Sequence, residues 1–165
     1  MNYSNNKNRK SVRLKNYDYG KNGLYFITIC IQNREHLLGN ISNNIHTVYD
    51  GGLMIESIWH NLPQYYKGIE TKEFVVMPNH IHGIIEFDNS SLDLSELVQR
   101  FKTFSTRQYI HGIHNNNWKP FYKKLWQRNY HEHIIRNEKS LEKLQNYIFN
   151  NPEQWKEDVL NNEIC

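Results

Sequence analysis

The sequence predicts an α+β sandwich of ferredoxin-like type, in which a mostly antiparallel sheet carries helices packed on one face. Three observations favour this fold. β-Branched and aromatic runs alternate with amphipathic segments, two of the runs are joined by a very short turn, and 165 residues suit one domain with one core. The expected order is therefore strand, helix, strand, strand, helix, strand, helix.

The strands are predicted from runs rich in β-branched and aromatic residues. The run from Leu24 to Ile31 is rich in β-branched and aromatic residues, as is typical of a central strand. Pro78 and Asn79 separate two further runs and favour a tight hairpin between them. The expected strands are residues 24–31, 70–77, 81–87 and 130–136, with a further short strand at 35–38 or 45–48.

The helices are predicted from apolar residues that recur at a spacing of three or four. Pro63 is expected to end the first helix, and Pro152 the last. Asn137 is a suitable N-cap for the last helix because its side chain can accept a hydrogen bond from a free backbone N–H. The expected helices are residues 52–62, 93–109 and 138–150.

Charge divides the chain into three parts. Residues 1–16 carry five basic side chains and no acid, residues 17–155 form the expected domain, and residues 156–165 form an acidic C-terminal tail. The basic, flexible arm indicates either a polyanionic partner or a solubilising leader. Two cysteines do not make a disulfide framework, and no segment is typical of a signal peptide or a membrane helix. The expected location is the cytoplasm, without a membrane partner.

His80-Ile81-His82 is the most informative motif of the chain. Successive strand side chains point to opposite faces, so His80 and His82 share one face while Ile81 points to the other. Two imidazoles on one face form half of a metal site. The alternative is a pair of solvated histidines on an open sheet face.

The last predicted helix carries Tyr147 and, four residues later, Asn151, which lie on one helical face. A lone tyrosine beside an apolar stripe usually packs at its rim. With a metal at His80 and His82, however, the phenol of Tyr147 could attack phosphorus as a nucleophile. Asn151 could supply an oxygen as the third ligand, and imidazole with oxygen ligation suits Mn²⁺ or Mg²⁺.

Rings alternate with positive charges between Trp118 and Tyr130, a pattern that suits single-stranded nucleic acid because bases stack on rings and phosphates attract cations. The alternative is a basic loop whose rings cover the core. The candidate nucleic-acid contacts, including those on the preceding helix, are Arg100, Lys102, Arg107, Lys119, Lys123, Lys124, Trp126 and Arg128.

His131-Glu132-His133 is a rival histidine pair on one strand face. Its spacing differs from that of the zinc proteases, whose two histidines lie one helical turn apart. We expect His133 to face the active site or to support it from a buried position.

Four blocks, in order, resemble those of the single-tyrosine HUH transposases of small insertion sequences, and are especially similar to the relatives associated with repetitive extragenic palindromes. They cover roughly residues 24–155, and the blocks are residues 74–84 with His80-Ile81-His82, residues 97–107, residues 126–136, and residues 147–152 with Tyr147 and Asn151.

The resemblance implies a metal-dependent enzyme that cleaves and rejoins single-stranded DNA near hairpins. Tyr147 would form a covalent 5′-phosphotyrosine, with His80, His82 and Asn151 as ligands of Mg²⁺ or Mn²⁺. The partner would be single-stranded or hairpin DNA of the nucleoid. The family contains monomers, and homodimers in which the tyrosine helix is swapped. Two alternatives stay open: a nuclease that uses water, and a domesticated transposase that only binds single-stranded DNA.

Overall fold

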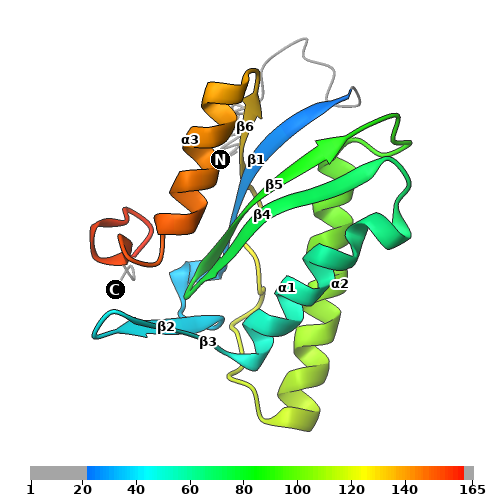
Figure 1. Cartoon of the computed structure of the whole chain (residues 1–165). Coiled ribbons are helices and arrows are strands. Elements are labelled where there is room, and N and C mark those ends of the chain that lie inside the picture. Colours follow the sequence, from blue (N-terminus) through cyan, green and yellow to red (C-terminus); the bar gives the residue numbers. More distant parts are fainter. Residues whose placement is uncertain (1–21, 162–165) are drawn as a thin grey trace, which may run out of the picture.

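The computed structural model describes residues 22–161, so the basic arm at residues 1–16 lies outside the described residues. The described residues form a four-stranded sheet, a separate two-stranded hairpin and three α-helices (Figure 1). The strands are β1 (Gly23–Cys30), β2 (Gly39–Ser42), β3 (Ile45–Val48), β4 (Ile69–Met77), β5 (His80–Phe87) and β6 (His131–Ile135). The helices are α1 (Asp50–Tyr65), α2 (Leu94–Asn116) and α3 (Glu138–Asn150), with short 3-10 turns at Gln32–Arg34 and Trp155–Glu157.

The main sheet has the order β4-β5-β1-β6, and each neighbouring pair is antiparallel. β4 and β5 form the predicted hairpin across Pro78 and Asn79. β1 is the central strand expected for its apolar run, and it pairs with both β5 and β6. The predicted α+β class with an antiparallel sheet is therefore confirmed.

The two faces of the sheet carry cores of different size. α1 and α2 cover the larger core, in which Ile27 of β1, Trp59 of α1 and Phe101 of α2 are buried. α3 packs across the opposite face, where Ile148 meets Ile84 of β5 in a smaller apolar cluster (Figure 1). α1 and α2 thus share one face, whereas α3 covers the other, which corrects the expectation that the helices all pack on one face. The apolar patch around Ile84 matches the stripe of α3.

Several boundaries follow from the sequence. α3 runs from Glu138 to Asn150 as predicted, and the Asn137 side chain accepts a hydrogen bond from the Ser140 N–H. α1 continues through Pro63 to Tyr65, a correction to the predicted end, because only one hydrogen bond is lost there and buried Leu62 anchors the turn. Of the two alternative short strands, the one at residues 45–48 forms, as β3. Within residues 22–161, none of the helices is both long and apolar enough to span a membrane.

Candidate active site

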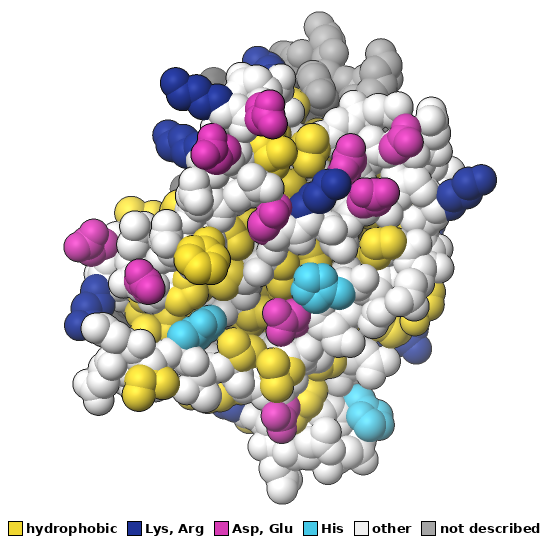
Figure 2. Space-filling model, viewed as in Figure 1, with side chains coloured by type: hydrophobic (Ala, Val, Ile, Leu, Met, Phe, Trp, Pro, Cys, Tyr) yellow, Lys and Arg dark blue, Asp and Glu magenta, His cyan; other side chains and the backbone are white. Residues whose placement is uncertain are grey.

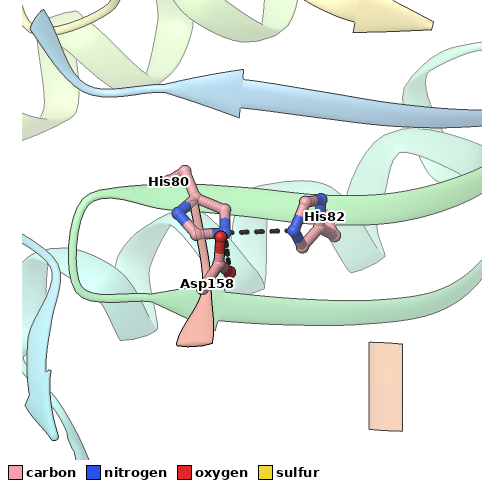
Figure 3. A group of neighbouring side chains, drawn as sticks. All are labelled: His80, His82 and Asp158. Carbon is pink, nitrogen blue, oxygen red and sulfur yellow. Dashed lines mark hydrogen bonds and ion pairs between the residues drawn. The ribbon is translucent and has the colours of Figure 1, made fainter. Parts of the chain in front are cut away.

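The histidine pair, His80 and His82, lies at the start of β5 on the face that α3 covers. The structure brings their Nε2 atoms to 3.0 Å, and the rings are buried, with exposed fractions of 0% and 2%. Both point into the space between the sheet and the C-terminal segment (Figure 3). The alternative of two solvated histidines on an open face is thus ruled out by burial.

Asn79 fixes the tautomer of His80. Its Nδ2 donates to the carbonyls of Leu160, at 2.8 Å, and Arg34, at 3.2 Å, so its amide orientation is determined. Its Oδ1 then faces the His80 Nδ1 at 2.8 Å and can only accept. The His80 proton must therefore be on Nδ1, which leaves the Nε2 lone pair for the neighbouring site.

Thr28 of β1 forms a hydrogen bond with His82. The two residues are register partners, and the Thr28 Oγ1 lies 2.7 Å from the His82 Nδ1. A hydroxyl can donate or accept, so it permits either tautomer of His82. When Thr28 accepts from Nδ1–H, the Nε2 lone pair of His82 is free to bind a ligand.

Burial keeps both imidazoles neutral. Loss of solvation lowers the pKa of His82 to about 3. The same effect, reinforced by the neighbouring His82, lowers the pKa of His80 well below its usual value. Both rings are therefore neutral at neutral pH, with one N–H and one free lone pair each, which is the form that binds metal ions.

The structure adds Asp158, which sequence reasoning placed in the acidic tail and missed. Its Oδ2 lies 3.8 Å from the His80 Nε2, and one ligand atom from each of His80, His82 and Asp158 falls within 4.8 Å of the others (Figure 3). The Leu160 N–H donates to the Asp158 Oδ1 at 2.7 Å and holds the carboxylate in place. Two imidazoles and a carboxylate form a group that could hold a divalent cation.

The C-terminal segment, residues 155–160, covers this group. Trp155 stacks over His80 with ring centroids 6.0 Å apart and planes 30° apart, and its own ring is buried. The Leu160 carbonyl accepts from Asn79, so the segment contacts His80 at its first residue and the β4–β5 turn at its last. Residues assigned by charge to a tail therefore pack against the histidine pair.

Tyr147 of α3 also reaches the histidine pair. Its hydroxyl lies 3.4 Å from the His82 Nε2, and its ring packs against His82 and Phe26 at centroid distances of 5.2 and 6.0 Å. Tyr147 is 37% exposed, so part of this residue is open to solvent. Burial and the negative charge of Asp158 raise the pKa of Tyr147, although the neighbouring Asn151 amide opposes this. The phenol is therefore protonated at neutral pH.

Asn151 follows one turn after Tyr147 and is 1% exposed. Its Nδ2 donates to the Asp158 Oδ2 at 3.3 Å. Its Oδ1 is buried and has no hydrogen-bond partner among residues 22–161. An unpaired buried amide oxygen costs free energy unless something binds it, so this atom suits a metal ion or a polar substrate group.

Two predicted nucleic-acid contacts need correction. Trp126 is buried against Phe101 and its indole N–H donates to the Ser105 Oγ at 2.9 Å, so its ring cannot stack on a base. The Lys102 ammonium donates hydrogen bonds to three backbone carbonyls of its own chain, so it is not free to contact DNA. The remaining candidates are exposed: Arg100, Arg107, Lys119, Lys123, Lys124 and Arg128.

His133 lies opposite Phe26 on β6, on the same sheet face as the histidine pair. It is exposed, so the expected buried position is wrong, while the alternative that it faces the active site stays a prediction. β6 is an edge strand, so its side chains beyond the reach of α3 meet solvent.

Comparison with known proteins gives consistent matches. The family model "Transposase IS200 like" matches residues 21–151. Two proteins of Haemophilus influenzae are similar. One, named "Uncharacterized protein", is 38% identical with 92% of each chain covered, and the other, named "Putative REP-associated tyrosine transposase", is 29% identical with 84% of this chain and 76% of its own covered.

Among solved structures, a REP-associated tyrosine transposase bound to a REP hairpin aligns with a TM-score of 0.61 and 24% sequence identity. The alignment covers 88% of this chain and 74% of that chain. This likeness shows that the two proteins share a fold.

Proposed function

Because this chain belongs to the IS200-like transposase family, we propose that it is a metal-dependent DNA strand transferase that cleaves and rejoins single-stranded DNA near hairpins. One observation carries the proposal: the Tyr147 hydroxyl lies 3.4 Å from the His82 Nε2 within one chain. A nucleophile and a cation site that serve the same phosphate must lie this close together.

The residues present fit a divalent cation. Two neutral imidazoles and the Asp158 carboxylate lie within 4.8 Å of one another, and the unpaired Asn151 oxygen belongs to a side chain that contacts Asp158. These groups match the mixed nitrogen and oxygen ligation of Mn²⁺ or Mg²⁺. A cation held by His80, His82 and one or both of these oxygens would stabilise the charge that develops on the scissile phosphate.

Tyr147 would supply the covalent step. Its phenol oxygen forms a bond to phosphorus while the bond to the 3′ oxygen breaks, which gives a 5′-phosphotyrosine and a free 3′-OH. The phenol loses its proton and the departing oxygen gains one. One phosphodiester bond replaces another, so the reverse reaction can rejoin strands without a separate energy source. The ring contacts with His82 and Phe26 would keep the phenol oxygen positioned to attack the phosphate.

Single-stranded or hairpin DNA is the proposed partner, which places the protein at the nucleoid in the cytoplasm. The name of one solved relative includes a REP hairpin, and this chain has exposed arginines and lysines to contact phosphates. In the view of Figure 2, acidic and basic side chains are intermingled, and no continuous basic surface crosses this face. We therefore expect the DNA to approach from another side of the molecule.

Tyr147 reaches His82 of its own chain, so a swapped helix is not needed to assemble the site. We propose that a single protomer is complete for cleavage. A dimer would then affect how two DNA ends meet, rather than whether one end is cut.

A labelled hairpin oligonucleotide incubated with Mn²⁺ tests the proposal. We expect a protein–DNA band that survives a denaturing gel. We expect Tyr147→Phe to abolish this band while DNA affinity stays within about threefold, since only one hydroxyl is lost. Cleavage by Tyr147→Phe would favour a nuclease that uses water. Binding without cleavage by the wild-type protein would favour a DNA-binding module.

A further inference from the structure

The partly buried ammonium of Lys102 is bound by three successive carbonyls. The Nζ atom donates to the oxygens of Gln127 at 3.0 Å, Arg128 at 3.2 Å and Asn129 at 3.3 Å. It also lies 5.5 Å from the centroid of the Tyr130 ring. An ammonium has three hydrogens to donate, so the three carbonyls use its full capacity. Lys102 thus joins the middle of α2 to the segment that precedes β6.

That segment is a bulge in the pairing with β1. Trp126 pairs with Ile31, and the pairing resumes where His131 faces Thr28. Residues 127–130 therefore oppose only residues 29 and 30 of β1, and the extra residues must leave the sheet. The three carbonyls of the bulge turn toward Lys102, which fixes its shape.

The bulge presents its N–H groups on the opposite side. The described peptide bonds are trans, so the N–H of each peptide points away from its carbonyl. The amides of Arg128 and Asn129 therefore point away from Lys102, and both residues are exposed. Within residues 22–161, neither amide donates to a backbone or side-chain acceptor. Two free amides beside a guanidinium form a suitable site for one phosphate.

The bulge also lies close to the candidate active site. Its last residue precedes His131, which faces Thr28, and the Thr28 hydroxyl contacts His82. A DNA strand whose scissile phosphate reached Tyr147 would have a neighbouring phosphate near this edge of the sheet.

We propose that residues 127–130 bind a backbone phosphate of the DNA strand next to the scissile linkage, and that Lys102 is a positioning residue that shapes this phosphate site without touching DNA. The inference rests on the proposed function. It assigns the DNA contact to Arg128 and the two amides, and it accounts for a lysine whose ammonium is bound by backbone carbonyls of its own chain.

The test measures binding of a hairpin oligonucleotide with short single-stranded flanks, with Tyr147→Phe as the background so that no strand is cut. Lys102→Met removes the ammonium at similar size, and we expect affinity to fall about tenfold, as for loss of one charge-assisted contact. Lys102→Arg can still donate to the carbonyls and should restore affinity to within about threefold. Lys67→Met, an exposed control in the turn between α1 and β4, should bind as the background does.

A neutral methylphosphonate placed at each linkage in turn identifies the phosphate. One position near the scissile linkage should weaken binding with Arg128 present, and the same substitution should have little effect with Arg128→Gln or Lys102→Met. Equal penalties at every position in all variants would overturn the inference. So would unchanged affinity of Lys102→Met or of Arg128→Gln. If Lys102→Met fails to fold, the Arg128→Gln scan still decides. Adduct formation by the wild-type protein is measured separately, so failure of this site does not imply failure of the proposed function.

Discussion

Replacement of Asn79 tests how the fold prepares His80 to bind a metal ion. Asn79→Leu removes the only described acceptor for the His80 Nδ1–H, in a ring that is 0% exposed. An orphaned buried donor costs about 1–3 kcal/mol, and the ring can avoid this cost by moving its proton to Nε2 or by turning. Either response removes the lone pair from the cation site. Loss of such a supporting partner typically lowers metal affinity 10- to 100-fold, or about 1.4–2.7 kcal/mol.

The assay is Mn²⁺ binding followed by electron paramagnetic resonance or calorimetry. Asn79→Asp is the matched variant, because a carboxylate still accepts from Nδ1–H but cannot donate to the carbonyls of Arg34 and Leu160. We expect it to retain affinity far better than Asn79→Leu. An exposed substitution, Asn115→Leu on α2, serves as the control for the change in residue type. Unchanged Mn²⁺ affinity in Asn79→Leu, or ¹⁵N shifts that place the wild-type His80 proton on Nε2, would refute the reasoning.

Three further predictions concern pH, the carboxylate and packing. Because the pKa of His82 is lowered to about 3, the unfolded chain takes up a proton below pH 6.5 that the folded chain does not. The free energy of unfolding should therefore decrease as the pH is lowered, by about 2 kcal/mol at pH 5 for this group. Urea unfolding should show a shallower dependence of stability on pH for His82→Gln than for the wild-type protein. Asp158→Asn removes a charge from the cation site, so its Mn²⁺ affinity should be about tenfold or more below that of the wild-type protein. Equal Mn²⁺ affinity of the variant and the wild-type protein would assign the oxygen ligand to Asn151 alone. A Cβ at Gly83 would lie 2.5 Å from the Trp59 ring, so Gly83→Ala should lower the free energy of unfolding by about 1–3 kcal/mol. Gly23→Ala is the control, because a Cβ there would have its nearest neighbour at 3.7 Å and should change the free energy of unfolding little. Equal losses in the two variants would contradict the packing argument.

The parts of the fold that local chemistry determines were predictable from sequence. Alternation along a strand placed His80 and His82 on one face, and the Asn137 cap fixed the start of α3. The face that α3 covers was not predictable in the same way, because its short apolar stripe could have extended either core. The smaller apolar patch around Ile84 determines which face α3 covers, but this patch can be recognised only once the strand order is known.

The site was predictable only where its residues belong to regular elements. Tyr147 lies on a helix whose phase the sequence indicates, and the structure brings it to His82. Asp158 reaches the histidine pair because the chain folds back after α3, and no periodic pattern describes that turn. Lys102 could not be distinguished from a DNA-binding lysine, since its partners are backbone carbonyls that any sequence provides. Trp126 was misassigned because a ring among basic residues can face either the core or a base.

Mass spectrometry of the protein–oligonucleotide adduct tests the central claim most directly. After digestion with protease and nuclease, the account predicts one modified peptide, with the added nucleotide mass on Tyr147 and absent when Mn²⁺ is chelated. A modification on any other residue, or complete strand cleavage without a modified peptide, would contradict the account.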